Sequence, residues 1–323
     1  MSKLAKFFAT KYAPLNVGIG ALLGSLLLSQ PALAQTPSLN LQLDLGAEYD
    51  SNVSVKELDR VTNVGDWAGV IHVGAKTEWA ATDKFKLRAG IYHDHKRYAE
   101  FDAFDLDVSR GNVDASYDFS ALTLGVSHDV ALARLDQQDF LHLAQTRLYA
   151  SKLMSQNLYL RGQFTQQVKN FSDQPERDAD SQLWGGDIYW FMNQAKSFVS
   201  LGLDREDEVA QQHNYSYEGV NLRARWSHKF TLLGFESQTQ LGWRYSDRDY
   251  QGPGLEPRAN AFGETEALPN RADRQQHWEA KWIVGLNDYV SLAAKIDYAD
   301  YRSNLDSASY QETVSAVQLQ TRF

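Results

Sequence analysis

The stretch that decides the fold is Leu39-Asn40-Leu41-Gln42-Leu43-Asp44-Leu45-Gly46-Ala47-Glu48-Tyr49. Apolar side chains occupy its odd positions, and polar or small residues occupy its even ones. Successive side chains of a β-strand point to opposite faces. This period of two therefore predicts a strand with one apolar face and one polar face.

The same period recurs along the rest of the chain. It runs from Trp67 to Trp79, two side chains about as far apart as the two interfaces of a membrane, and resumes from Phe85 to Ile91 after a turn at 81–84. Further strands are expected near 104–117, 121–132, 140–152, 158–170, 181–191, 197–205, 215–230, 235–246, 275–285, 289–301 and 310–323. The total is about fourteen strands.

The connectors between these strands alternate in length. Short ones are expected at about 80–84, 118–120, 153–157, 192–196, 231–234 and 286–288, and longer polar ones at about 51–66, 97–103, 133–139, 171–180, 206–214, 247–274 and 302–309. Bacterial barrels have short periplasmic turns and long external loops. We therefore predict an all-β fold, a transmembrane antiparallel up-and-down β-barrel in the cell outer membrane of a Gram-negative bacterium, with both termini on the periplasmic side.

Residues 1–34 have the pattern of a signal peptide. Three lysines precede the apolar stretch from Val17 to Leu28, and Ala32-Leu33-Ala34 offers a cleavage site with small residues. The apolar stretch is shorter than the roughly 20 residues of a spanning helix. We predict that residues 1–34 are removed and that residues 35–323 form the barrel as one domain.

The composition excludes several classes of protein. Without the three leader lysines, 29 of the 32 basic side chains remain against 41 acidic ones, and this net charge of −12 argues against a nucleic-acid partner. The absence of cysteine excludes thiolate metal sites and cysteine nucleophiles. Aromatic residues make up 12% of the chain, which fits a barrel whose aromatic side chains gather at both interfaces.

Two features of the strand series are distinctive. Leu106 and Val108 share a parity that the apolar residues of 113–117 do not, and a β-bulge at Arg110-Gly111-Asn112 would reconcile them. The last strand ends on Phe323. A terminal phenylalanine in this position resembles the signal that the barrel-assembly machinery recognises, so that machinery is an expected partner, together with outer-membrane lipid and lipopolysaccharide.

The connector from Asp247 to Asp273 is the longest. It contains three prolines and several glycines, and it is too short and too polar to bury a core of its own. It is expected to be an external loop, with an inward fold that constricts the pore as the alternative.

The polar parity of the strands predicts the surface of the lumen. Both signs of charge occur on it, which suits small hydrophilic solutes. The expected pore-lining side chains are Lys86, Arg88, Arg161, Arg223, Arg225, Glu236, Gln238, Arg244, Glu279, Lys281 and Lys295, and the same face carries Lys76, Glu78, Asp94, Asp204, Gln240, Asp297 and Arg322.

Arg223, Arg225 and Arg244 form one group across a hairpin. One interpretation is an arginine ladder that selects anionic solutes, because guanidinium binds carboxylate bidentately. The other, which the interleaved acids favour, is a wall in which arginine and glutamate neutralise each other.

His93 and His95 are the residues most suggestive of chemistry. Two histidines separated by one residue on a strand can chelate a metal. They share the parity of Ile91, however, so we expect them to face the headgroup region in a structural role. No serine-hydrolase elbow, phosphate-binding loop or His-Glu-x-x-His motif is present, and we expect no enzyme activity, no metal and no cofactor.

Two segments resemble a known group of proteins. They are Glu48-Tyr49-Asp50-Ser51-Asn52-Val53, which ends the first strand, and Tyr301-Arg302-Ser303-Asn304 with Tyr310 and Phe323 in the last hairpin. These resemble the start and end of Gram-negative porin-like barrels, including the C-terminal barrel domain of surface lipoprotein assembly modifiers.

The resemblance implies two functions. The modifier family implies assistance in moving lipoproteins to the cell surface, although its members usually carry a periplasmic helical-repeat domain before the barrel, and here about four residues separate the predicted cleavage site from the first strand. A barrel alone is sufficient for a diffusion channel. We therefore expect an outer-membrane porin for small hydrophilic solutes, with a lipoprotein assembly modifier and a barrel enzyme or structural protein as alternatives.

Overall fold

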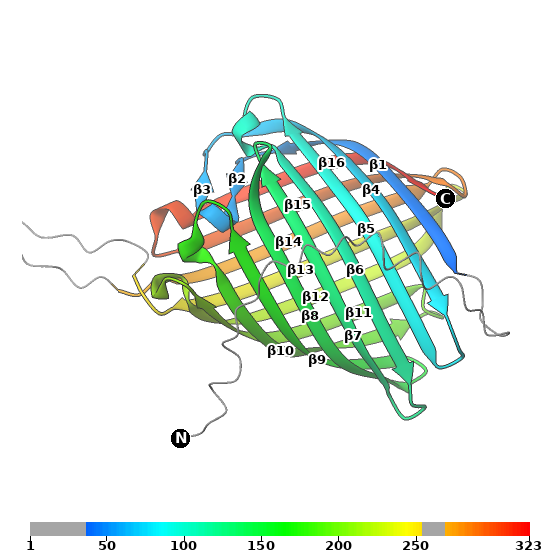
Figure 1. Ribbon diagram of the computed structural model, residues 1–323. Coiled ribbons are helices and arrows are strands. Elements are labelled where there is room, and N and C mark those ends of the chain that lie inside the picture. Colours follow the sequence, from blue (N-terminus) through cyan, green and yellow to red (C-terminus); the bar gives the residue numbers. More distant parts are fainter. Residues whose placement is uncertain (1–36, 254–268) are drawn as a thin grey trace, which may run out of the picture.

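Fourteen antiparallel strands form a closed barrel in the computed structural model, which describes residues 37–253 and 269–323 (Figure 1). The strands are β1 (Ser38–Asp50), β4 (Asp66–Ala80), β5 (Phe85–Tyr98), β6 (Leu106–Asp118), β7 (Thr123–Leu135), β8 (Gln138–Ser155), β9 (Leu158–Phe171), β10 (Ala179–Met192), β11 (Ser197–Ala210), β12 (Tyr217–Leu232), β13 (Phe235–Tyr250), β14 (Ala272–Gly285), β15 (Val290–Ser303) and β16 (Tyr310–Arg322). The fold class expected from the sequence is confirmed. The predicted signal peptide, residues 1–34, lies outside the described residues.

Each strand pairs with its neighbours in sequence, and β1 closes the ring. Leu43 on β1 lies opposite Val73 of β4 on one side and opposite Thr321 of β16 on the other. This closure pairs the backbone groups of both strands that would otherwise form edges. The start of β1 and the end of β16 lie at the same end of the barrel, as the pairing of Gln42 with Arg322 requires.

The apolar parity of the strands faces outward. Side chains such as Leu45, Ile91 and Leu201 are exposed on the outside, and Ile91 is 66% exposed. In a soluble protein this much exposed apolar surface would be unfavourable, whereas here it faces lipid. The tryptophans that remain exposed on the same face are Trp67, Trp184, Trp190, Trp278 and Trp282.

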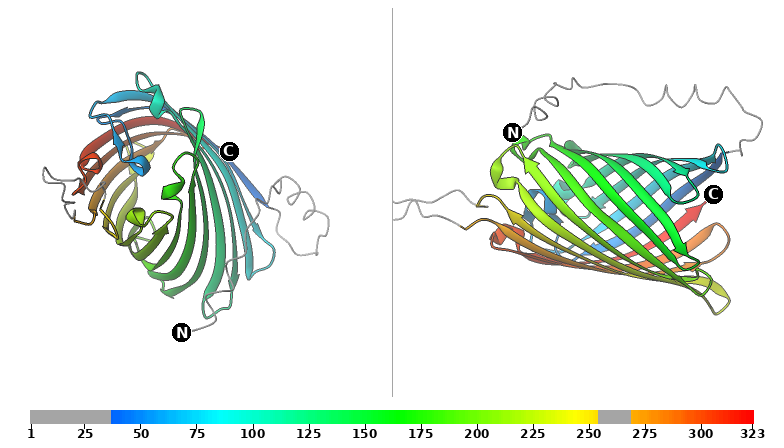
Figure 2. Two further views of the ribbon diagram at one scale, coloured as in Figure 1. Left: turned by 60° about the vertical axis from the view of Figure 1, so that its left-hand side comes forward. Right: turned by 90° about the horizontal axis from the view of Figure 1, so that it is seen from below.

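The two ends of the barrel differ, and Figure 2 shows both. At the turn end, short connections join the strands. One of them is at Leu233 and Gly234, both of which have positive φ. At the loop end, longer connections carry single-turn 3-10 helices, which are η2 (Lys56–Leu58), η3 (Asp102–Phe104), η4 (Pro175–Arg177), η5 (His213–Tyr215) and η6 (Asp306–Ala308). Among the residues described, no helix is long and apolar enough to cross a membrane.

The predicted bulge at Arg110-Gly111-Asn112 is wrong. The strand β6 pairs without a shift in register from Leu106 to Tyr117, with β5 on one side and β7 on the other. Val108 lies opposite Asp94, so it shares the inner face with it, and Asp107 points outward. The apolar parity of the sequence changes along β6 because the outward-facing residues near the loop end of this strand are polar. These residues lie beyond the apolar band that faces lipid.

The predicted long connector at about 133–139 is also wrong. Strand β7 continues to Leu135, and β8 begins at Gln138. Asp136 and Gln137 form a two-residue turn with φ values of 49° and 63°, and the register shifts at Ala133 and Arg134. Positive φ at both central residues is what a tight antiparallel hairpin needs, and aspartate tolerates it better than most residues.

The longest connector is only partly described. Strand β13 extends to Tyr250 and β14 begins at Ala272, so the strands take up both ends of the expected loop. Residues 254–268 lie outside the described part of the chain, and so does the choice between an external and an inward course for them.

Gly185 on β10 marks a place where the wall leaves no room for a side chain. It lies directly opposite Asp204 of β11, and a Cβ at position 185 would overlap the Asp204 carboxylate and the backbone oxygen of Leu203. The Asp204 carboxylate accepts hydrogen bonds from Arg223 and Gln163. A side chain at position 185 would therefore disturb the ladder and this network together.

We predict that Gly185→Ala lowers the free energy of unfolding by about 1–3 kcal/mol, because overpacking forces the backbone or the carboxylate to move. Urea titration of the barrel in lipid vesicles measures the effect. The matched control is Gly162→Ala on β9, where an added Cβ meets nothing within 4 Å. Equal stability of the two variants would contradict the assignment.

Candidate functional site

The connection between β1 and β4 folds into the barrel instead of standing outside it. We call residues 51–65 the inner loop. Its two short strands, β2 (Ser54–Val55) and β3 (Arg60–Val61), pair with each other, and η2 lies between them. Asp59, next to η2, has a φ of 52°. Figure 2 shows the two short strands within the mouth of the barrel at its loop end.

The root of the inner loop is attached to β16. Asn52 donates a hydrogen bond to the backbone oxygen of Gln311 (3.0 Å) and accepts one from the backbone nitrogen of Asn63 (2.9 Å). Ser54 donates one to the hydroxyl oxygen of Tyr310 (3.3 Å). Val53 is fully buried between these contacts. The loop therefore leaves the wall at a fixed angle.

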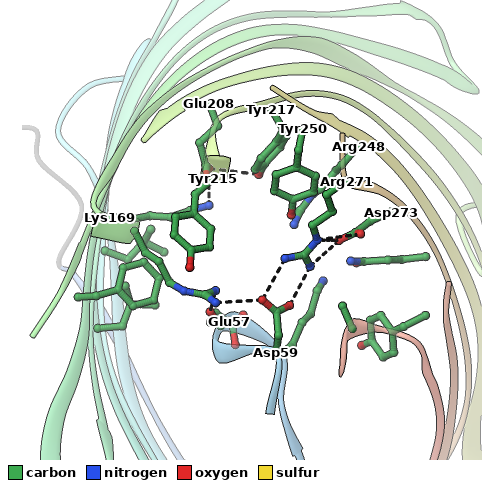
Figure 3. A pocket seen from close by; sticks show the side chains of 18 of the residues that line it. Glu57, Asp59, Lys169, Glu208, Tyr215, Tyr217, Arg248, Tyr250, Arg271 and Asp273 are labelled. Carbon is green, nitrogen blue, oxygen red and sulfur yellow. Dashed lines mark hydrogen bonds and ion pairs between the residues drawn. The ribbon is translucent and has the colours of Figure 1, made fainter. Parts of the chain in front are cut away.

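The tip of the inner loop is held by two arginines from other connectors at the loop end. Arg271 donates hydrogen bonds to both oxygens of the Asp59 carboxylate, at 2.8 and 3.0 Å (Figure 3). Arg177 donates one to the same carboxylate at 3.0 Å. The side chains of Asp59 and Arg271 are 12% and 6% exposed. Arg271 is itself oriented by Asp273. We call Asp59, Arg177 and Arg271 the clamp.

Aromatic rings support the clamp. The guanidinium of Arg177 lies over the ring of Tyr215 at 4.5 Å, and that of Arg271 lies over Tyr250 at 4.6 Å. Arg177 also donates a hydrogen bond to the backbone oxygen of Glu57 (2.7 Å). Stacking on a ring fixes the plane of a guanidinium and leaves its edge free for the carboxylate.

The electrostatics of the inner loop follow from this packing. Burial alone would raise the pKa of Asp59, but the hydrogen bonds and charges of Arg271 and Arg177 lower it below its ordinary value of 3.8. A depressed acid pKa means that the clamp contributes stability above that value, which is lost as the pH falls through the pKa of the folded state.

Lys56 is the unfavourable charge of the inner loop. Burial, assisted by the nearby charge of Arg248, lowers its pKa to about 8. Its ammonium lies 5.5 Å from the centre of the Tyr301 ring, and none of the described carboxylates forms an ion pair with it. The ion pairs of Asp59 therefore stabilise the inner loop, whereas the burial of Lys56 destabilises it.

A cavity of about 200 Å³ separates the tip of the inner loop from the wall. Its lining combines basic side chains with tyrosines, among them Lys169, Tyr215 and Tyr217. Lys169 forms an ion pair with Glu208 (2.5 Å), which also accepts a hydrogen bond from Tyr217 (3.1 Å). The arrangement is polar and hydrogen-bonded, and it suits a hydrophilic occupant.

By alternation along the strands, the expected pore-lining residues lie on the face opposite the exposed apolar side chains, and their role in lining a pore stays a prediction. Those on the strands near β5 and β9 contact acids or rings: Arg88 pairs with Glu78 (2.7 Å) and Asp114 (3.2 Å), and Arg161 lies 3.9 Å from the centre of the Tyr149 ring. Lys86 lies opposite Ser116 in the ladder. These residues sit nearer the turn end than the clamp does.

The three arginines of the predicted ladder differ from one another. Arg223 forms ion pairs with Asp187 and Asp204, which fits the salt-bridged wall. Arg225 lies 3.9 Å from Glu279, and its side chain is 55% exposed to the lumen. Arg244 donates a hydrogen bond to His277 (2.8 Å), not to a carboxylate.

The remaining expected residues line the same part of the lumen. Lys295 forms ion pairs with Glu279 (3.6 Å) and Asp297 (2.6 Å) and lies opposite Lys281. Gln238 donates a hydrogen bond to Ser227 (2.8 Å). Glu236, at the start of β13, lies opposite Thr231.

Reasoning from the sequence missed the inner loop and its clamp. Asp59, Arg177 and Arg271 lie in connectors, where no alternation of apolar and polar residues indicates which way a side chain points. Their separations of 118 and 212 residues leave no local signal either. The length of the first connector is the one sequence feature that relates to the inner loop, and it predicts only a long external loop.

Comparison with known proteins agrees with this architecture. A family model described as "Surface lipoprotein assembly modifier" matches residues 72–323. A search of curated proteins found no match.

Several solved outer-membrane proteins are similar to this chain in structure. A loop L8 deletion mutant of OmpT, an outer membrane protein of Vibrio cholerae, is similar with a TM-score of 0.50 and 6% identity, over 90% of this chain and 100% of that one. OprD from Pseudomonas aeruginosa has a TM-score of 0.42 and 12% identity, over 88% and 95%. CdiB from Acinetobacter baumannii has a TM-score of 0.46 and 10% identity over 88% of this chain, which spans only 60% of its length. The chain is an outer-membrane β-barrel.

We predict that Asp59→Asn frees the tip of the inner loop, because it removes the carboxylate that Arg177 and Arg271 share and leaves Arg271 paired with Asp273 alone. Breaking a buried ion pair costs about 3 kcal/mol, which corresponds to roughly 100-fold faster amide exchange within residues 53–61. Hydrogen exchange with mass spectrometry measures it. The matched control is Glu57→Gln, because only the backbone oxygen of Glu57 contacts Arg177. Unchanged exchange in the Asp59 variant would contradict the clamp.

Proposed function

The chain belongs to the surface lipoprotein assembly modifier family, and from that premise we propose that the barrel assists the assembly of lipoproteins on the cell surface. The observation that carries the proposal is the family match, which covers most of β4 and every barrel strand from β5 to β16. An outer-membrane barrel lies between the periplasm and the cell surface, which is where such an activity is needed.

The inner loop gives this proposal a structural element. Its tip is held by hydrogen-bonded charges and not by an apolar core, whereas its root is fixed by Val53 and Asn52. Charged groups that separate can be solvated by the water of the lumen, so the tip can move without exposing a large apolar surface. We propose that the tip narrows the outer mouth at rest and yields to a client.

We predict that deletion of the gene reduces the fraction of lipoproteins that an external protease can reach on intact cells, because delivery to the surface is impaired. Radiolabelled palmitate identifies the lipoproteins, and proteinase K digestion followed by gel analysis gives the accessible fraction. Total lipoprotein should stay constant, and a plasmid copy should restore the accessible fraction. An unchanged accessible fraction in the deletion strain would count against the proposal.

A channel for small hydrophilic solutes is the second candidate. The observation that favours it is the charged and exposed inner face, where Arg225 and Arg244 project into the lumen. Side chains of this kind keep a lumen hydrated, and hydrated lumens conduct small polar solutes. Neither candidate needs a catalytic step, and we propose that the barrel acts without one.

We predict that Asp59→Asn increases single-channel conductance in planar bilayers, because the released tip no longer narrows the outer mouth. Glu57→Gln should conduct like the unaltered protein. Steps of equal size in all three proteins would mean that the inner loop does not limit conduction. A complete absence of conductance in folded, inserted protein would reject the channel.

A further inference from the structure

Two histidines on the outside of the barrel, His93 and His95, lie beside Asp107 of the neighbouring strand β6. His93 and His95 flank Asp94 on β5, and the Asp94 carboxylate binds His72 and Arg110 inside the lumen. Because strand side chains alternate, both flanking imidazoles point outward. On β6, Ser109 lies directly opposite His93, and Asp107 lies opposite His95.

The ligand atoms of these residues converge on one point. Oδ1 of Asp107 lies 2.5 Å from Nδ1 of His95 and 4.0 Å from Nε2 of His93, and one ligand atom from each of the three residues lies within 4.8 Å of the others. Two ligand atoms each about 2.1 Å from a tetrahedral Zn²⁺ are separated by ~3.4 Å. The two observed distances bracket that value, so small side-chain rotations would complete the geometry.

Neighbouring groups orient the three residues. Nδ1 of His93 lies 3.0 Å from the hydroxyl oxygen of Ser109, which leaves Nε2 directed at the aspartate. Arg97 donates a hydrogen bond to Oδ2 of Asp107 (2.7 Å), which leaves Oδ1 directed at the imidazoles. Partners of this kind fix the ring orientation and the carboxylate plane in metal sites.

The position of the cluster makes it accessible. It borders a hollow of about 490 Å³ on the outer surface, which Leu132, Phe140 and His142 also line. Along β5 it follows Ile91, the last strongly exposed apolar side chain before the loop end. The cluster therefore lies where the apolar band gives way to the polar headgroup region, within reach of ions from water.

We propose that His93, His95 and Asp107 form a binding site for a divalent transition-metal ion of the Zn²⁺ type. Two imidazoles and one carboxylate suit Zn²⁺ and its neighbours in the series, whereas Mg²⁺ and Ca²⁺ prefer oxygen ligands. Three protein ligands leave one tetrahedral position open for water or for a group supplied from outside.

The test is isothermal titration of the full-length barrel in detergent micelles with ZnCl2. We expect one ion per chain, and roughly 10-fold or greater loss of affinity in the double variant His93→Ala/His95→Ala. His128→Ala is the matched control, because His128 is also an exposed histidine, paired with Thr146 and not with a carboxylate. Its affinity should equal that of the unaltered protein.

Asp107→Asn provides a second variant with a smaller change of shape, and it should also bind Zn²⁺ more weakly. Excess MgCl2 should not displace the zinc. Circular dichroism and the shift in gel mobility on heating establish that each variant is folded. Equal zinc affinity in the unaltered protein and the double histidine variant, or no saturable binding by the folded unaltered protein, would overturn the proposal.

Discussion

Pairing of the backbone is the constraint on which the rest of this structure depends. Hydrocarbon offers no hydrogen-bond partner, so every N–H and C=O at membrane depth must find one within the wall. The chain achieves this by closing β1 on both β4 and β16. Because side chains alternate along each strand, closure also assigns every wall residue to lipid or to lumen. The pairing of neighbouring strands therefore fixes the lipid face and the lumen face of all strands together.

The inner loop uses the rigidity of that wall. Arg177 and Arg271 lie in different connectors, yet the ring of strands brings them within hydrogen-bond distance of one carboxylate. Removing Asp59 from water is costly, and two guanidiniums offset that cost only if their positions are held. The wall and the rings of Tyr215 and Tyr250 hold them. A loop tip that is held by ion pairs and not by an apolar core can be well ordered at rest. It can still detach, because the water of the lumen solvates the separated charges.

The strands could be predicted from the sequence, because the period of two records which side faces lipid. The outer ends of some strands could not: β11 continues to Ala210 and β13 to Tyr250, where polar residues alternate with polar residues but backbone pairing persists. The clamp could not be predicted from the sequence for a different reason. Its members contact one another across the lumen, so their relation exists only once the wall is closed.

The course of β6 shows how strongly one register decides the chemistry of a surface. A slip of one residue exchanges the two faces of a strand. With the expected bulge at 110–112, Asp107 would have faced the lumen, and no carboxylate would stand opposite His95. The continuous ladder instead places Asp94 inside with His72 and Asp107 outside with His95. Two neighbouring strands thus carry an ion-paired lumen wall on one face and a cluster of metal-ligand type on the other.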